Sequence, residues 1–200
     1  MYNLEIGDFI MKTNKKIYSS KRASFAALIV IFLLLQGILE FGFGLSLFVF
    51  GLNPNFIRLI LIIVLILFPL FDGTPATTKQ DKINRILYTV FATILILGGV
   101  FFYMLGFSDD KYFSFKNPSG NKTLVVSERS AWFYGNSTFY VRKYGIFIKD
   151  INQSIGTDDG FRPFSTNQYS IEWTDDYNVV INYDFGGGGS QWFTTTVKLK

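Results

Sequence analysis

The sequence predicts a fold that combines membrane α-helices with a β domain: about three transmembrane helices, then a small antiparallel β-sandwich or partly closed barrel. Long apolar runs are confined to residues 23–107, whereas residues 108–200 contain short alternating segments separated by turn residues. Residues 1–107 hold nine Lys and Arg against five Asp and Glu, while residues 108–200 hold ten of each. We therefore expect a cytoplasmic tail (1–22), a transmembrane region (23–107) and an extracytoplasmic β domain (108–200).

Three apolar runs predict helices at about 23–50, 56–71 and 86–107. A helix needs roughly 20 apolar residues to cross the hydrocarbon core of a bilayer. The third run meets this length and the second is short. The first is too long, so it either tilts or leaves the membrane direction near Gly42–Gly44. Two spans remain an alternative, if the second run is only a buried or interfacial piece.

Basic residues predict the orientation, because cytoplasmic flanks of membrane helices retain positive charge. The first apolar run is preceded, and the second is followed, by clusters of Lys and Arg: Lys12, Lys15, Lys16, Lys21 and Arg22, then Lys79, Lys82 and Arg85. The link between the first two runs, residues 51–55, carries no charge. This pattern predicts a multi-pass protein of the cytoplasmic membrane, with its N-terminus inside and its C-terminal domain outside.

The N-terminus admits two further interpretations. Basic residues before an apolar run are also typical of a signal peptide. The run is too long for that and lacks a small-residue cleavage site, so we expect an uncleaved first span. The stretch that begins at Met11 resembles a bacterial translation start, which leaves Met1 and Met11 as alternative first residues.

Three polar residues near the apolar runs are the candidate functional residues: Gln36, Glu40 and Arg58. A carboxylate inside a membrane is costly to bury, so Glu40 is a candidate proton site, cation site or ion-pair partner. Gln36 lies one helical turn earlier on the same face and is a candidate hydrogen-bond partner for Glu40. The alternative, which we favour, is a helix over about 23–41, which would leave Glu40 at the level of the outer headgroups and Phe41–Phe50 along the interface. Arg58 is expected nearer the outer surface, extended toward the lipid phosphates.

Seven segments of residues 108–200 have strand composition and are separated by turn residues. They are Tyr112–Lys116, Lys122–Glu128, Thr138–Lys143, Gly145–Ile151, Tyr169–Trp173, Asn178–Phe185 and Gln191–Leu199. Apolar and polar residues alternate most clearly over Val179–Phe185, which predicts a strand with one buried face.

The composition argues against most catalytic chemistry. The chain has no His and no Cys, so thiolate nucleophiles, imidazole bases and zinc or iron–sulfur sites are excluded. The acidic doublets Asp109-Asp110, Asp158-Asp159 and Asp175-Asp176 lack the alternate spacing of a calcium loop and are expected to be turn residues. No catalytic motif, cofactor motif or basic stripe for nucleic acid is present. We therefore expect neither an enzyme nor a cofactor, and no nucleic-acid partner.

Six short motifs between residues 117 and 185 carry a resemblance. They are Asn117–Gly120, Leu124–Glu128, Gly145–Lys149, Thr157–Gly160, Arg162–Phe164 and Ile171–Asp176. Together they resemble an uncharacterised family of small Gram-positive membrane proteins, with N-terminal transmembrane helices and a β-rich extracytoplasmic domain of unknown function. The resemblance implies a fold and a cellular context, and no site residues.

Two classes of function follow. In the first, the protein is a binding or accessory module whose β domain recognises an envelope ligand or a membrane protein partner while the helices anchor it in the lipid bilayer. In the second, it has a transport- or immunity-type role that depends on the helices around Glu40. The first is favoured because the β domain is nearly half of the chain.

Overall fold

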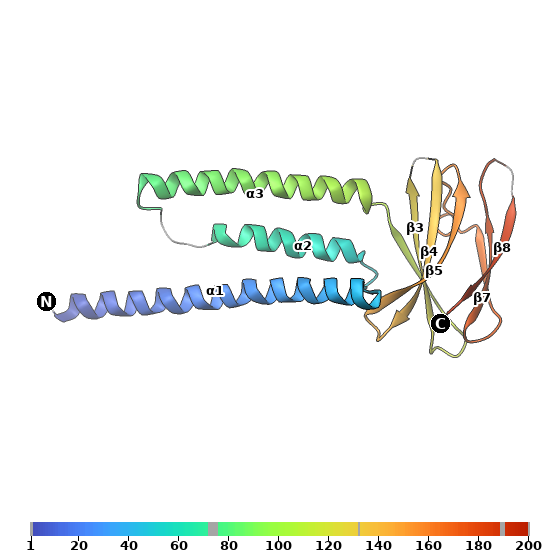
Figure 1. The fold of residues 1–200 in the computed structure, drawn as a ribbon, viewed down its shortest axis with the longest axis horizontal. Coiled ribbons are helices and arrows are strands. Elements are labelled where there is room, and N and C mark those ends of the chain that lie inside the picture. Colours follow the sequence, from blue (N-terminus) through green and yellow to red (C-terminus); the bar gives the residue numbers. More distant parts are fainter. Residues whose placement is uncertain (1, 72–75, 132, 189–190, 200) are drawn as a thin grey trace.

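The computed structural model describes the backbone of residues 2–71, 76–131, 133–188 and 191–199, with side chains from Lys21 onward within these ranges, Ala131 excepted. Three helices lie side by side, and a β domain sits against one end of them (Figure 1). The helices are α1 (Tyr2–Phe43), α2 (Pro54–Leu67) and α3 (Lys79–Gly106), with a short 3₁₀-helix η1 (Phe68–Phe71) after α2.

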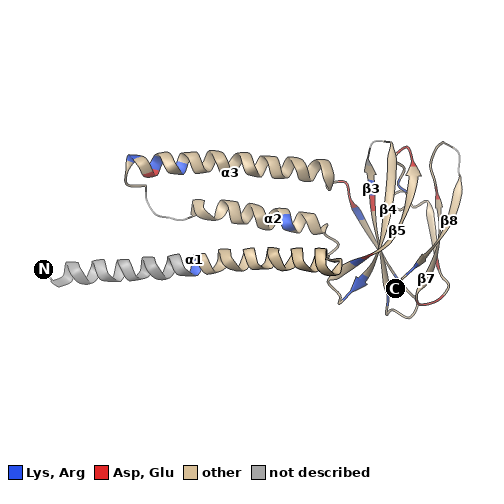
Figure 2. Cartoon of the chain, in the orientation of Figure 1, with Lys and Arg blue, Asp and Glu red and all other residues tan. Residues whose placement is uncertain are grey.

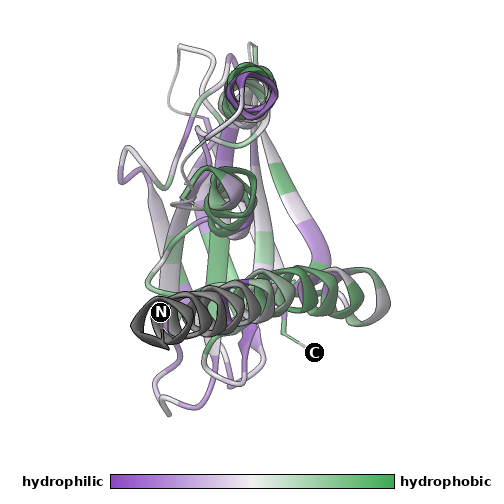
Figure 3. Cartoon of the chain, turned by 90° about the vertical axis from the view of Figure 1, so that its left-hand side faces the viewer, coloured by the Kyte–Doolittle hydropathy of each residue, from purple (hydrophilic) through white to green (hydrophobic). Residues whose placement is uncertain are grey.

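The helices are long and apolar enough to cross a membrane, over Lys21–Phe43, Pro54–Phe71 and Lys79–Gly106. Hydrophobic colouring runs along them, whereas the strands are mixed (Figure 3). Most of their large apolar side chains are exposed in the isolated chain, as Leu28 and Leu97 are. Such an apolar surface is stable in lipid rather than in water.

Local sequence signals mark the helix ends. The Thr78 hydroxyl accepts a hydrogen bond from the Asp81 backbone N–H (3.1 Å), and the Asp81 carboxylate accepts one from the Thr78 N–H (3.1 Å). This capping box starts α3. Asn53 caps α2, where Pro54 occupies the first turn. Gly44, at φ 65°, ends α1 in the left-handed conformation that glycine favours.

The prediction that the first helix extends to residue 50 is wrong, and the alternative that the chain leaves the helix direction near Gly42–Gly44 is confirmed, because α1 ends at Phe43. After Gly44 the chain forms a short strand, β1 (Leu45–Leu47), which pairs with β5 of the β domain. The apolar composition of residues 45–50 fits both structures. The glycine ends the helix, and the open edge of the sheet supplies hydrogen-bond partners for the strand.

Two antiparallel sheets make up the β domain, and they are not closed into a barrel. The first has the strand order β1-β5-β4-β3-β2 and the second has the order β6-β7-β8. The remaining strands are β2 (Lys111–Lys116), β3 (Thr123–Ala131), β4 (Tyr134–Lys143), β5 (Phe147–Asp158), β6 (Tyr169–Trp173), β7 (Asn178–Asp184) and β8 (Trp192–Lys198). All seven predicted strands are present.

The two sheets pack face to face around one core. Leu124 and Val126 of β3 and Phe139 of β4 face Val179 and Ile181 of β7 across it, and all five are buried. Because side chains alternate along a strand, the intervening residues of β3 and β4 point to the other face of the larger sheet, toward the helices.

Glu128 is a buried carboxylate within this core face of β3. It accepts hydrogen bonds from the backbone N–H groups of Phe164 (2.8 Å) and Ser165 (2.9 Å) and from the Ser165 hydroxyl (2.5 Å). A buried charge is stable only when such donors replace water. Glu128 therefore fixes the connection between β5 and β6, which brings the Phe164 ring into the core.

This arrangement predicts a loss of stability for Glu128→Gln. The new amide nitrogen would face N–H donors, and the free energy of unfolding should fall by about 1–3 kcal/mol. Denaturant unfolding of the full chain in detergent micelles, followed by tryptophan fluorescence, measures this. The exposed Glu172→Gln on β6 is the matched control. Equal stability of the two variants would contradict the role given to Glu128.

Candidate functional site

A polar cavity of about 320 Å³ lies between the ends of the helices and the face of the larger sheet that is turned away from the core of the β domain. Helix-side residues, among them Glu40 and Asn55, form one wall. The strands form the other wall. A larger hollow of about 490 Å³ shares Asp110 and Tyr112 with this cavity, but it is a shallow surface that includes Phe56 and Tyr103. The polar cavity is therefore the candidate site.

Strand alternation determines which side chains enter the cavity. On β3, Ser127 and Arg129 line it, whereas Leu124, Val126 and Glu128 belong to the opposite face. Four further strand residues lie on the same face of the sheet as Ser127 and Arg129 and also line the cavity. They are Tyr112 of β2, Asn136 and Thr138 of β4, and Asp150 of β5. Tyr140 of β4 completes this wall.

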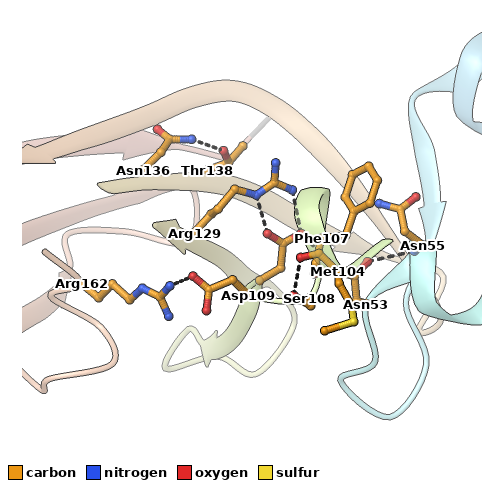
Figure 4. Close-up of polar contacts among 11 residues, drawn as sticks. Asn53, Asn55, Met104, Phe107, Ser108, Asp109, Arg129, Asn136, Thr138 and Arg162 are labelled. Atoms are coloured by element: carbon orange, nitrogen blue, oxygen red, sulfur yellow. Dashed lines mark hydrogen bonds and ion pairs between the residues drawn. The ribbon is translucent and has the colours of Figure 1, made fainter. Parts of the chain in front are cut away.

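Asp110 connects the helices to the sheet. Its carboxylate accepts two hydrogen bonds from the Arg129 guanidinium, from Nε at 2.5 Å and from a terminal nitrogen at 2.9 Å. The Asn53 side-chain amide donates to the same carboxylate (3.1 Å) and to the Phe107 carbonyl oxygen (2.9 Å). Figure 4 shows Arg129 extending from the sheet toward the Phe107 end of α3, close to Asn53. The start of α2, the end of α3 and β3 thus share one polar contact.

The Arg129 guanidinium is held in its charged form in this contact. The hydrogen bonds from Arg129 to Asp110 raise the pKa of the guanidinium, and burial opposes this only in part. The guanidinium also lies over the Phe107 ring, 5.3 Å from its centroid. Such stacking on an aromatic face adds attraction and restricts the position of the cation.

Tyr112 and Tyr140 are neutral hydrogen-bonding groups of the cavity. The pKa of Tyr112 is raised to about 12, chiefly by burial; the hydrogen bond with Ser127 opposes this in part, and the charge of Asp110 makes a smaller contribution in the raising direction. Burial also raises the pKa of Tyr140, with Tyr112 as the next cause. Both hydroxyls therefore stay protonated at physiological pH. The charge of the cavity is determined by its carboxylates and by Arg129.

Asp150 occupies an irregular position in the sheet. The register between β4 and β5 shifts between Thr138 and Tyr140, and Asn152 has φ 55°. The Asp150 carboxylate accepts a hydrogen bond from the Asn152 backbone N–H at 2.6 Å, which stabilises this bulge. Bulges redirect side chains. This one places an exposed carboxylate at the margin of the cavity.

Glu40 and Arg58 form an ion pair on the helix side of the cavity. Glu40 also accepts a weak hydrogen bond from the Ser46 hydroxyl (3.4 Å), and Arg58 donates to the Asn55 side chain (3.1 Å). The expectation that Arg58 extends away from Glu40 to the lipid phosphates is wrong. Because α1 ends at Phe43, both residues lie about one turn from the same end of antiparallel helices.

Gln36 does not hydrogen-bond Glu40, its candidate partner. It is 5% exposed, and neither its side-chain oxygen nor its nitrogen has a hydrogen-bond partner among the described residues. The structure thus brings Glu40 and Arg58 together and leaves Gln36 apart from them. An unsatisfied buried amide is unfavourable, and it contributes nothing to the cavity.

Sequence reasoning missed the strand residues of the site. Polar side chains alternate over Ser127 and Arg129, but the other face of the same strand carries Glu128 at an interior position. The alternation therefore did not show which face was the polar one.

The acidic doublets differ from one another: Asp109 pairs with Arg162 and Asp110 with Arg129. Asp175 behaves as the predicted turn residue and accepts from the Tyr177 N–H (2.7 Å).

Comparisons with protein-family models, with curated proteins and with solved structures found no match to this chain. The function of the chain must therefore be inferred from the geometry and charge of the junction, by which we mean the contact region between the helix ends and the larger sheet around the polar cavity.

The ion pair predicts energetic coupling between α1 and α2. Glu40→Gln and Arg58→Gln each leave one charge without its partner, so each should lower the unfolding temperature in lipid nanodiscs. The double variant should lose less than the sum of the two, with a coupling free energy of about 0.5–3 kcal/mol. Calorimetry of all four proteins completes the cycle. Strictly additive effects would argue that the pair is only incidental.

Proposed function

We propose that this chain is a membrane-anchored binding module of the cytoplasmic membrane. Its β domain is held on the outer face, and the junction cavity binds a small polar ligand that carries a positively charged amine. One observation carries the proposal: a polar cavity of about 320 Å³ has walls from both the helices and the sheet. A ligand in this place contacts the anchor and the β domain at once.

The charges of the described helix ends support the proposed orientation. Lys21 and Arg22 of α1 lie at the end of the bundle remote from the β domain, as do Lys79, Lys82 and Arg85 of α3 (Figure 2). Both clusters are thus on one side of the three helices. Positive charge collects on the cytoplasmic side, so the β domain is assigned to the outer side. This orientation agrees with the extracytoplasmic domain that the family resemblance implies.

The charges of the cavity support a cationic ligand. Glu40 is compensated by Arg58, and Asp110 by Arg129. Asp150 forms no ion pair within the described part of the chain. The cavity therefore has one carboxylate in excess, in addition to the hydroxyls of Tyr112 and Tyr140. A carboxylate in excess and hydroxyl oxygens that can accept hydrogen bonds together favour an ammonium group, which has only donors.

The helix-centred alternative, a transport- or immunity-type role, receives less support. A proton or cation site needs a carboxylate that can exchange its partner, whereas Glu40 is held by Arg58 and Ser46. The binding role requires only that the junction stays intact while the ligand enters beside it. We therefore retain the binding module as the proposed function.

The orientation is tested by labelling Ser119→Cys in intact cells with a membrane-impermeant maleimide. Ser119 is exposed in the turn between β2 and β3, and the natural chain has no other cysteine to react. We expect labelling without lysis. A lysed sample is the control for expression and reactivity. Labelling only after lysis would place the β domain in the cytoplasm and overturn the proposed orientation.

The ligand class is tested with ethanolamine, choline and spermidine, added to the full chain in nanodiscs, with sodium acetate and sodium phosphate as anionic controls. We expect at least one of the amines to raise the unfolding temperature, because a ligand that binds only the folded state stabilises it. Asp150→Asn keeps an oxygen for the bulge and removes the charge, so affinity should fall by about tenfold, or 1.4 kcal/mol.

Asp175→Asn is the matched control for that substitution. Asp175 also accepts hydrogen bonds from backbone N–H groups, but it lies in the turn between β6 and β7, away from the cavity. It should leave amine binding unchanged. Equal amine affinities of the two variants, or no stabilisation by any amine, would overturn the proposed ligand class.

A further inference from the structure

The turn between β4 and β5 exposes two large apolar side chains. Tyr144 is 84% exposed and Ile146 is 48% exposed. Tyr144 has φ 51° and the following Gly145 has φ 76°. A bulky residue with positive φ is uncommon, and Asn or Gly suits such a turn better. The turn geometry therefore does not account for a tyrosine here.

The turn is attached to the chain that connects α1 with α2. Because β1 pairs with the start of β5, the turn lies directly beside the residues that follow β1. The Phe48 backbone N–H donates a hydrogen bond to the Ile146 carbonyl oxygen at 2.8 Å. In Figure 1 the turn projects back from the sheet to the level at which α1 ends.

Exposed phenylalanines surround the same level of the molecule. Phe41, near the end of α1, is 92% exposed, and Phe50, in the connection to α2, is 96% exposed. Phe43 is the last residue of α1 and is also exposed. We define these three with Tyr144 and Ile146 as the apolar rim. The rim contains residues of both the helical segment and the β domain.

The position of the rim along the helices identifies its partner. The spanning segment Lys21–Phe43 has 23 residues and is therefore about 34 Å long. A bilayer hydrocarbon core is about 30 Å thick. The end of α1 thus reaches the boundary between hydrocarbon and headgroups when the helices span a bilayer. Aromatic side chains are favoured at that boundary.

We propose that the β4–β5 turn is seated in the headgroup region of the bilayer, so that Tyr144 and Ile146 contact lipid directly. This seating holds the β domain against the membrane surface and places the mouth of the junction cavity at the level of the lipid headgroups. It depends on the helices spanning a bilayer and does not depend on which side the β domain occupies or on the cavity ligand.

The test uses spin labels on single cysteines in the full chain, reconstituted in phosphatidylcholine–phosphatidylglycerol vesicles. Tyr144→Cys and Ile146→Cys report on the turn. Tyr177→Cys is the matched control, since Tyr177 is also an exposed turn tyrosine but lies at the β6–β7 turn. Leu97→Cys, on the exposed apolar surface of α3, marks the hydrocarbon core. Collision with oxygen and with a water-soluble nickel chelate measures depth.

We expect the labels at 144 and 146 to lie between those at 177 and 97 in the ratio of oxygen to nickel collisions. Ratios at both turn positions equal to that at 177 would overturn the proposal. Protection from both reagents would also overturn it, because that result indicates a protein contact instead of lipid. If Tyr144→Cys lowers the unfolding temperature of the chain, the label at 146 decides.

Discussion

The buried carboxylate of Asp110 is the constraint on which the junction depends. It cannot stay charged away from water without partners, and its partners come from two directions: Arg129 from the sheet and Asn53 from the start of α2. Asn53 in turn caps α2 and holds the Phe107 carbonyl at the end of α3. Satisfying one carboxylate therefore fixes the position of two helix ends relative to β3. Asp110 and Arg129 also line the cavity, so the same contact forms part of its wall.

A second ion pair gives the junction its other fixed point. Glu40 and Arg58 hold α1 and α2 together about one turn from the helix ends that face the β domain. Strand β1 follows α1 directly and pairs with β5 of the larger sheet. The sheet is thus connected to the helices through α1, α2 and α3, and not through a single flexible linker. In a membrane setting such ion pairs at helix ends are less costly than at mid-depth. The polar residues accordingly gather at the junction, and the spans stay apolar.

The sequence predicts the regular parts of this fold well and the junction poorly, for physical reasons. Apolar length and period-two alternation are local properties, so three helices and seven strands could be recognised from them. Strand β1 could not, because the three residues Leu45–Leu47 are too short to show a pattern of their own and form a strand only by pairing with the free edge of β5. The Arg58–Glu40 contact was missed for the same reason, since it requires α1 to end at Gly44. Tyr112, Tyr140 and Asp150 share one face of the sheet only through strand pairing and a bulge.

These features together determine what a ligand in the cavity could influence. Its walls include Asn55 of α2 and Asp150 of β5. These residues are far apart in the chain, and one belongs to the helices while the other belongs to the larger sheet. A ligand that contacts both favours one distance between the helices and the sheet. It can shift the equilibrium between different distances only as far as its affinities for those arrangements differ. With three helix connections and a turn seated in the headgroups, few alternative spacings remain. The module we propose is therefore better suited to holding a ligand at the membrane surface than to a large movement on binding.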